Sequence, residues 1–295
     1  MSNNEIIPFT ILNDAVRGRI IKLDGELNKI LKQHHYPDPI NKILTELLIA
    51  SAIIGSQFKE EIILSVQLQS EHAVKYVIAD FQSPNQIRGY AQFDNKLDYG
   101  NISYEDIISK AIIIVTIDRI LHSNQRYQGI IEISNLSITK SIEKYFSQSE
   151  QIKTLFKIAI GNYITPGSET LFCAGGIMIQ KLPSRNDSDD DEHWREAQAY
   201  FTTIKDHELI DPELSSERLL YSLYHEVGVK VYDYLPIINK CRCSRQKAEE
   251  VLISLGEKEV SSLLVENLIE INCQFCSQSQ KFSSQDVKEM FLLTK

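Results

Sequence analysis

The stretch Cys241-Arg-Cys243 to Cys273-Gln-Phe-Cys276 places two short cysteine pairs near the end of the chain, with 29 residues between the pairs. Thiolate is the ligand that Zn²⁺ takes in closed, four-coordinate structural sites, and paired cysteines are typical of such sites. The C-x-x-C spacing is ordinary for zinc, whereas the one-residue spacer of C-x-C is unusually tight. We predict that these four cysteines bind one Zn²⁺. The alternative is two unrelated pairs of small buried thiols.

The segment around the cysteines has no excess of positive charge. Residues 236–295 contain 8 Lys and Arg against 8 Asp and Glu, and the 295-residue chain has a net charge of −9. A zinc ribbon that binds nucleic acid should be basic, because phosphate neutralisation supplies most of its affinity. The charge therefore disfavours a nucleic-acid partner. A zinc-ribbon nucleic-acid or translation-associated binding protein is the alternative function.

Residues 1–183 mix predicted helices and strands in blocks, which favours an α+β domain over a doubly wound fold. Asp38 is predicted to be the N-cap, and Pro39 the first residue, of a helix whose long apolar face reaches about Gln57 and belongs to the core. The pattern then changes to the alternation typical of a strand. The same reasoning predicts strands at 62–69, 74–79, 87–93, 111–117, 130–133, 155–160 and 177–182, and further helices at 24–35 and 137–150.

A second segment, residues 184–235, is predicted to be a helical linker. It begins with the acidic stretch Asn186–Glu192, which has no apolar residue and is predicted to be a solvated loop at the domain boundary. Helices are predicted at 194–204 and 212–225, the second with Pro212 at its first position. The apolar side of the second helix is made of Leu219, Leu220, Leu223 and Tyr224.

Residues 236–295 are predicted to form the small zinc-binding domain. Helices are expected at 244–255 and 258–268, and a hairpin at 273–282. Ser283 and Asp286 have the spacing that caps a final helix.

The sequence contains no motif that requires an enzyme. Gly175-Gly176 lacks the Lys-Ser/Thr of a phosphate loop, which weakens any ATP-dependent function. Cys273-x-x-Cys276 as a thiol oxidoreductase site lacks the helix-start setting that lowers a thiol pKa. No charged-then-apolar leader and no run of about 18 apolar residues is present, so we expect a cytoplasmic protein with no membrane partner. In a reducing cytosol, clustered cysteines indicate metal or redox chemistry.

Zinc holds cysteines as thiolates, the reactive form of sulfur. An oxidant would convert them to sulfenic acid and then to disulfide. Cys273 and Cys276 are well spaced to bridge each other, and Cys241 and Cys243 could bridge with some strain. Disulfide sulfur is a poor zinc ligand, so oxidation should release the metal and unfold the module. A purely structural site would obey the same physics.

Beyond this array, the chain resembles the heat-shock protein 33 (33 kDa chaperonin) family of redox-regulated bacterial holdase chaperones over nearly its whole length. The resemblance is carried by Ala15-Val16-Arg17-Gly18, Val66-Gln67-Leu68-Gln69, Ile87-Arg88-Gly89, Arg126-Tyr127-Gln128-Gly129, Tyr145-Phe146 with Ser149-Glu150-Gln151, Ala174-Gly175-Gly176, Leu223-Tyr224-His225-Glu226 and the four-cysteine array.

The resemblance implies an α+β core, a metastable helical linker and a C-terminal zinc domain. It implies that the reduced, zinc-loaded protein is inactive and that oxidation forms the Cys241–Cys243 and Cys273–Cys276 disulfides. Zinc release then unfolds the linker and exposes apolar surface that holds unfolding client proteins without ATP, and the oxidised form becomes a homodimer. Our hypothesis for the client-binding surface is Leu219, Leu220, Leu223 and Tyr224, with the N-terminal surface that the linker covers.

The sequence departs from the family pattern at three places. Ser277 follows Cys276 where glycine is common, so the turn at this position is expected to be strained. Gly228, in Val227-Gly228, stands where acidic residues are common, and Cys173 replaces a small residue. None of these changes one of the four predicted ligands.

Overall fold

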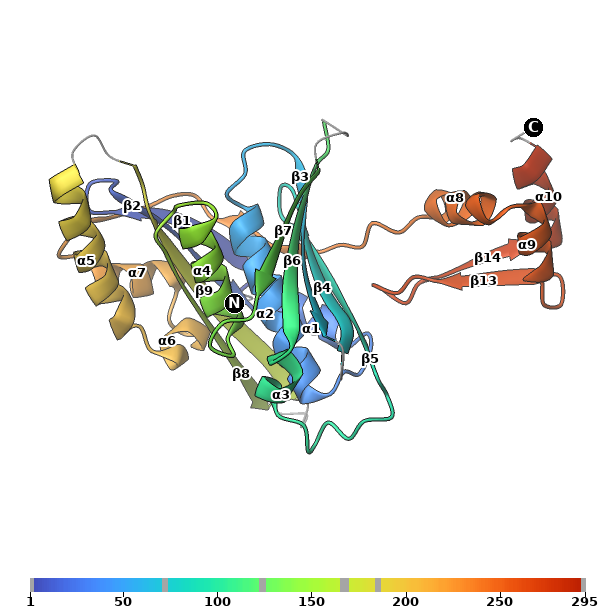
Figure 1. Cartoon of the computed structure of the whole chain (residues 1–295), viewed down its shortest axis with the longest axis horizontal. Coiled ribbons are helices and arrows are strands. Elements are labelled where there is room, and N and C mark those ends of the chain that lie inside the picture. Colours follow the sequence, from blue (N-terminus) through green and yellow to red (C-terminus); the bar gives the residue numbers. More distant parts are fainter. Residues whose placement is uncertain (1–2, 71–73, 122–125, 165–169, 184–186, 293–295) are drawn as a thin grey trace. The chain divides into compact units, whose positions relative to one another are not determined.

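The computed structural model describes residues 3–70, 74–121, 126–164, 170–183 and 187–292, without the side chains of 187–190. The chain divides into two compact units, residues 1–239 and 240–295. Each unit combines helices and β-strands (Figure 1), so the predicted α+β class is confirmed. Across the described ranges, every helix is too short or too polar to span a bilayer.

The first unit contains two six-stranded sheets. The first sheet has the order β10-β1-β2-β9-β8, with β11 also paired to β1, and its strands are β1 (Glu5–Ile11), β2 (Val16–Leu23), β8 (Thr154–Ile164), β9 (Thr170–Lys181), β10 (Val229–Val231) and β11 (Leu235–Pro236). The second sheet has the order β12-β5-β4-β3-β6-β7, and its strands are β3 (Ile62–Ser70), β4 (Val74–Gln82), β5 (Gln86–Phe93), β6 (Ala111–Arg119), β7 (Arg126–Glu132) and β12 (Ile238–Asn239).

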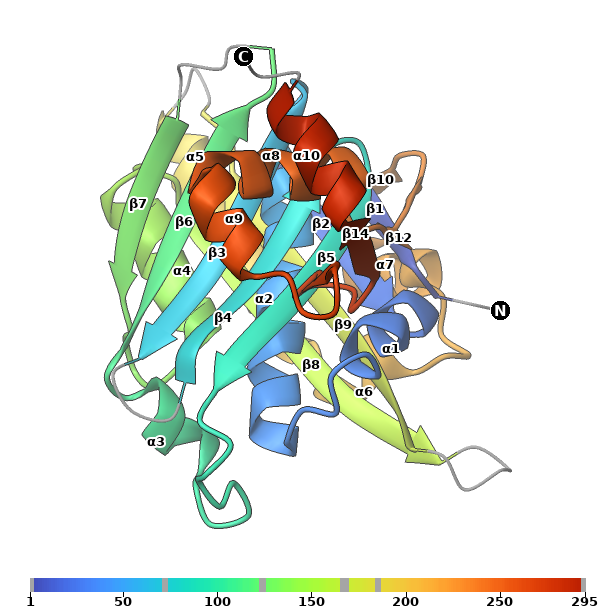
Figure 2. The same cartoon turned by 90° about the vertical axis from the view of Figure 1, so that its right-hand side faces the viewer.

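Helix α2 (Asp38–Gly55) packs between the two sheets and forms the centre of the main core (Figures 1 and 2). Its residues are apolar on almost every side because both flanks are covered, and the predicted core role is confirmed. The predicted N-cap at Asp38 is wrong by one residue: Pro37 is the N-cap, without a side-chain hydrogen bond, and Asp38 is the first helical residue. Close packing against the first sheet requires glycine at position 176. A Cβ on Gly176 would lie 2.5 Å from Ile49 Cγ2, well inside contact distance. Three shorter helices complete this region: α1 (Gly25–Leu31), α3 (Tyr104–Ile108) and α4 (Ile138–Gln148).

Three helices cover the other face of the first sheet: α5 (Asp187–Thr203), α6 (Asp206–Ile210) and α7 (Ser216–Tyr224). Their buried side chains, among them Trp194 and Leu219, share a second core with Phe9 and Ile20 of the sheet. Phe9 and Tyr224 stack with their ring centroids 6.0 Å apart. Burial on both faces gives β1 adjacent apolar residues, Ile6 and Ile7, which face different cores. Strands β1 and β2 are not among the predicted strands, although β2 alternates at residues 16–19 and β8 and β9 of the same sheet were predicted.

The prediction of a solvated loop at Asn186–Glu192 is wrong for Asp187 to Glu192, because α5 begins at Asp187; Asn186 lies outside the described residues. Acidic residues are favourable at the start of a helix, where the macrodipole is positive. Asp191 also accepts hydrogen bonds from Lys153 at 2.8 Å and Lys181 at 3.1 Å, which fasten α5 to the first sheet. These bonds hold the pKa of the Asp191 carboxyl down at about 2.

Two predicted helix boundaries also differ from the structure. Helix α7 begins at Ser216 rather than Pro212, because the Ser215 side chain accepts a hydrogen bond from the Arg218 N–H and caps the helix there. The predicted helix at 258–268 is shorter: α9 spans Glu257–Ser262. Glu266 and Asn267 then adopt positive φ values of 50° and 65°, which turn the chain into a strand at Leu268.

The second unit is a small module built on the hairpin β13 (Leu268–Asn272) and β14 (Ser279–Ser283). Its helices are α8 (Arg245–Leu255), α9 and α10 (Ser284–Leu292). The predicted cap of the last helix is confirmed, since Ser283 N and Oγ both donate to Asp286 at 2.7 Å. Seven buried side chains form the core: Leu252, Val260, Ile269, Phe282, Val287, Met290 and Phe291. A core of this size rarely stabilises a module without a metal or a cross-link.

Candidate metal centre

Cys273 and Cys276 lie in the turn that joins β13 to β14. The hairpin register pairs Asn272 with Ser279. The turn is closed by Cys273 N donating to Gln278 O at 2.9 Å and Ser277 N donating to Cys273 O at 2.8 Å. Ser277 has a φ of 56°, in the left-handed region that favours glycine. The strain expected at this position is therefore confirmed.

Cys241 and Cys243 lie in the extended segment that precedes α8. The Ser244 hydroxyl accepts a hydrogen bond from Lys247 N at 3.2 Å, which fixes the start of the helix directly after Cys243. Arg245 then connects this arm to the hairpin. Its guanidinium lies over the Phe282 ring at 4.3 Å and donates to Lys281 O at 2.7 Å.

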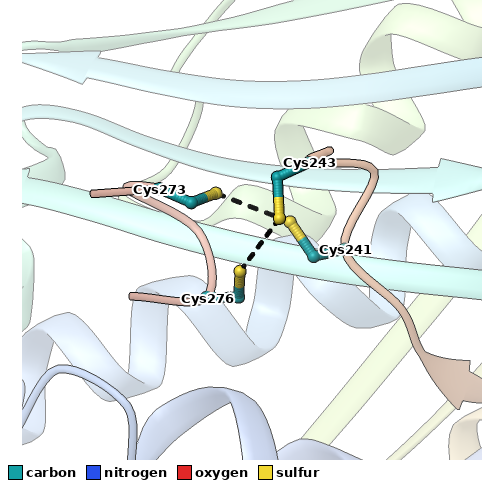
Figure 3. Close-up of side chains that lie close together, drawn as sticks. All are labelled: Cys241, Cys243, Cys273 and Cys276. Atoms are coloured by element: carbon teal, nitrogen blue, oxygen red, sulfur yellow. Dashed lines mark hydrogen bonds between the residues drawn. The ribbon is translucent and has the colours of Figure 1, made fainter. Parts of the chain in front are cut away.

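The four cysteine side chains point toward one another (Figure 3), and all four Sγ atoms lie within 4.8 Å of one another. The hydrogen-bonded sulfurs join the two pairs crosswise, with 3.6 Å between Cys241 and Cys273 and 3.3 Å between Cys243 and Cys276. All four side chains are half-buried.

The electrostatics of the cluster favour one thiolate but not four. Burial raises the pKa of the Cys241 thiol, yet hydrogen bonds from Cys243 N and from the thiols of Cys243, Cys276 and Cys273 outweigh it and bring this pKa to about 7. Burial, followed by interactions with neighbouring thiols, raises the pKa of Cys243. Burial also raises the pKa of Cys276. Ionising every sulfur in one small volume requires a cation, and a coordinated thiol is deprotonated outright.

The cluster fits a tetrahedral metal ion. Zinc–sulfur bonds of about 2.3 Å place the sulfurs of a tetrahedral site about 3.8 Å apart. Two sulfur–sulfur contacts, of 3.3 and 3.6 Å, are slightly shorter than this, and every sulfur–sulfur distance is at most 4.8 Å, so small side-chain adjustments reach the tetrahedral spacing. Four sulfur donors are characteristic of structural zinc. The cluster can therefore bind a metal ion, and its donor set suits Zn²⁺.

The other residues singled out in the sequence lie in the first unit. Leu219, Leu220 and Tyr224 are completely buried in α7 against the first sheet, and Leu223 is half-buried beside them. Cys173 is a half-buried free thiol in β9. Arg126 pairs with Asp118 at 2.6 Å, and His225 Nδ1 contacts Tyr221 O at 3.0 Å.

Sequence reasoning missed Arg245, which joins the two cysteine arms. One surface arginine beside Ser244 gives no signal of this role, because its partners lie far along the chain in β14 and α10.

Comparisons with known proteins all match the same family over most of the chain. The family model described as Hsp33 protein matches residues 4–283. The 33 kDa chaperonin of Caulobacter vibrioides is 33% identical over 283 residues, covering 92% of each chain. That of Pseudomonas savastanoi pv. phaseolicola is 30% identical over 288 residues, covering 96% of this chain and 92% of the relative. The crystal structure of the 33 kDa chaperonin (heat shock protein 33 homolog) from Thermotoga maritima superposes with a TM-score of 0.83 at 20% identity, covering 99% of both chains. This last likeness concerns the fold.

Proposed function

The chain belongs to the Hsp33 family, and on that premise we propose that this chaperone is a redox-regulated, ATP-independent holdase of the cytoplasm. The observation that carries the proposal is the convergence of four sulfurs, from two separate arms, within 4.8 Å of one another. The proposed organisation is a chaperone core at 1–183, a linker at 184–235 and a zinc-binding switch at 236–295.

In the reduced state Cys241, Cys243, Cys273 and Cys276 would hold Zn²⁺, which would keep all four sulfurs as thiolates. The hairpin turn and the capped start of α8 present the two arms of this site. The module's small core leaves its folding dependent on that cross-link. Structural zinc contributes about 10–16 kcal/mol to the folding of modules of this kind, more than a small core supplies.

Oxidation would remove these ligands in two steps for each disulfide. A cysteine thiolate attacks the oxygen of hydrogen peroxide, which forms sulfenic acid and releases hydroxide. With hypochlorous acid it attacks the chlorine and releases hydroxide, and water hydrolyses the resulting sulfenyl chloride to sulfenic acid and chloride. A second thiol then displaces the sulfenic oxygen as water and forms the disulfide. We propose the pairs Cys241–Cys243 and Cys273–Cys276. Four thiols thus give up four electrons to two oxidant molecules.

Unfolding of the linker would expose the client-binding surface. Leu219, Leu220 and Tyr224 are buried against the first sheet, so separation of α7 uncovers both these side chains and sheet residues such as Phe9. Large exposed apolar surfaces mark protein-interaction sites. The partners we propose are unfolding client proteins and, in the oxidised state, a second copy of the chain.

The test is a titration of the zinc-loaded protein with hypochlorous acid, with released zinc, free thiols and disulfide connectivity measured on the same samples. We expect release of one zinc per chain in step with the loss of four thiols, and the two neighbouring disulfides in mass spectra. Cys173, which is half-buried and remote in sequence, should remain a free thiol. Zinc release without disulfide formation, or disulfides without zinc release, would contradict the switch.

A further inference from the structure

A cavity of about 590 Å³ lies in the first unit, outside the metal centre and the linker. It is bounded by the end of α2, strands β6 and β7, helix α4 and the residues that follow α4. Most of its wall is apolar, and the principal contributors are Ile54, Phe58, Ile117, Ile131, Ile142 and Phe146. Its size is within the range of small-molecule sites, which are mostly apolar with a few polar groups.

The charged side chains of the wall include more arginines than carboxylates. Three arginines line the cavity, against the single carboxylate of Glu150. Arg126 is already paired with Asp118, and Arg119 with Glu60 at 3.0 Å. Glu150 accepts hydrogen bonds from the hydroxyls of Tyr127 at 3.1 Å and Tyr145 at 2.9 Å. The third arginine, Arg17, has no carboxylate partner among the described residues.

Arg17 is a half-buried cation held only by a neutral group. Its Nε and Nη2 both donate to one oxygen, Gln180 Oε1, at 3.2 and 3.0 Å. Arg19, two residues further on β2, donates to Ser56 O at 3.2 Å. Burial lowers the pKa of Arg17. Burial and then the charge of Arg17 lower that of Arg19 to about 10, as expected for two neighbouring buried cations.

Two buried nitrogen donors in this region have no hydrogen-bond partner among the described residues. They are Arg19 Nε and Gln57 Nε2. Gln57 itself lines the cavity. Buried donors and cations are costly unless they are paired. A group that satisfies Arg17 and Gln57 must therefore be an acceptor and should carry negative charge.

We propose that this cavity binds a single-chain fatty acid, with its carboxylate at Arg17 and Gln57 and its hydrocarbon chain against the apolar wall. Charge complementarity selects a carboxylate head, and the isoleucine and phenylalanine wall selects an aliphatic tail. Four segments quoted above for the family resemblance contribute to the lining, through Arg17, Arg126-Tyr127, Tyr145-Phe146 and Glu150. The proposal does not depend on the redox switch.

Isothermal titration calorimetry of the reduced, zinc-loaded full chain with decanoate tests this site. Decan-1-ol, which has the chain without the carboxylate, and acetate, which has the carboxylate without the chain, measure the contribution of each part. We expect one decanoate to bind per chain, at least about ten-fold more tightly than decan-1-ol, because only the carboxylate forms charge-assisted hydrogen bonds with Arg17. Acetate should bind more weakly than decanoate. Equal binding of decan-1-ol would overturn the role of the cation, and no binding of decanoate would overturn the site.

Two variants locate the ligand. Arg17→Gln removes the charge but keeps an amide donor for Gln180, and we expect about ten-fold or greater loss of decanoate affinity. Arg195→Gln, at an exposed position in α5, removes the same charge elsewhere and should leave the affinity unchanged. Ile152→Trp fills the cavity without touching Arg17 and should abolish binding. Thermal unfolding checks that each variant is folded. If Arg17→Gln does not fold, the test rests on Ile152→Trp. Unchanged decanoate affinity in folded Ile152→Trp would show that the fatty acid does not bind in this cavity.

Discussion

Arg245 donates from Nη2 to Asp286 Oδ1 at 3.0 Å, and this contact joins the C-x-C arm of the metal centre to the last helix. Asp286 simultaneously caps that helix through Ser283. The position of Cys243 relative to the hairpin therefore depends on a side chain that binds no metal.

Replacing Arg245 by alanine should weaken the metal centre without changing a ligand. The variant loses the contacts with Lys281 O, Asp286 and the Phe282 ring, which together are worth about 1–2 kcal/mol in a half-exposed setting. We expect about ten-fold faster zinc transfer to a chromophoric chelator under reducing conditions. Lys258→Ala, at an exposed position in α9, is the matched control. Equal rates for Arg245→Ala and wild type would show that the two arms are held by the metal alone.

Ser277→Gly should tighten the metal centre. Ser277 has a φ of 56°, and the left-handed conformation costs an L-residue about 1–2 kcal/mol that glycine does not lose. Part of this gain is offset because glycine is more flexible in the unfolded state. We expect up to about 1 kcal/mol of added stability and a higher oxidant dose at half-maximal zinc release. A lower dose would contradict the strain argument.

Lys22 fastens the loop before α7 to the first sheet. Its buried ammonium donates to the carbonyl oxygens of Asp211 at 2.8 Å and Leu214 at 2.5 Å. Lys22→Met leaves these carbonyls unsatisfied and should loosen the linker by about 1–3 kcal/mol. We expect faster proteolysis of residues 187–235 and measurable chaperone activity in the reduced, zinc-loaded state. Lys29→Met removes an exposed lysine of the same unit and should change neither.

Glu46 should make the first unit less stable as pH rises. Burial raises the pKa of this carboxyl to about 7, although the hydrogen bond from Tyr104 and the charge of Lys42 oppose it. Because the folded pKa exceeds the unfolded value, the folded state binds more protons between about pH 4.5 and pH 7, and its stability falls across that window. The loss approaches about 3 kcal/mol at most.

Glu46→Gln should remove this dependence. The difference in unfolding free energy between variant and wild type, measured by denaturant titration of the zinc-loaded protein, should move in favour of the variant from pH 5 to pH 8. Effects of pH on the metal ligands cancel in the comparison. A difference that is constant with pH would show that Glu46 is ionised throughout.

Elements with a single dominant pattern could be predicted from the sequence. Apolar residues recur at helical spacing in α2 and at every second position in β3, so each pattern indicates both the element and its buried side. The four cysteines are identified by their spacing and their chemistry as zinc ligands. Strand β1 was not predictable in this way, because its adjacent apolar residues face two different cores, whereas the alternation of β2 at residues 16–19 was overlooked. The start of α5 escaped prediction because Asp191 finds its lysine partners only in the folded chain.

The cavity at Arg17 could not be predicted from the sequence either, because it depends on contacts between residues far apart along the chain. Arg17 and Gln180 are 163 residues apart, and no local pattern indicates that their side chains meet. Nor does the sequence reveal that Arg17 and Arg19 have no carboxylate partner within the described ranges, which only the packed structure discloses.

Light scattering from a heat-unfolding client protein tests the central claim most directly. The protein would be added either reduced and zinc-loaded, or oxidised by hypochlorous acid with its zinc released and quantified, both without ATP. The account predicts that only the oxidised, zinc-free form suppresses aggregation, and that reduction with zinc restores the inactive form. Equal suppression by both forms, or by neither, would contradict the redox switch.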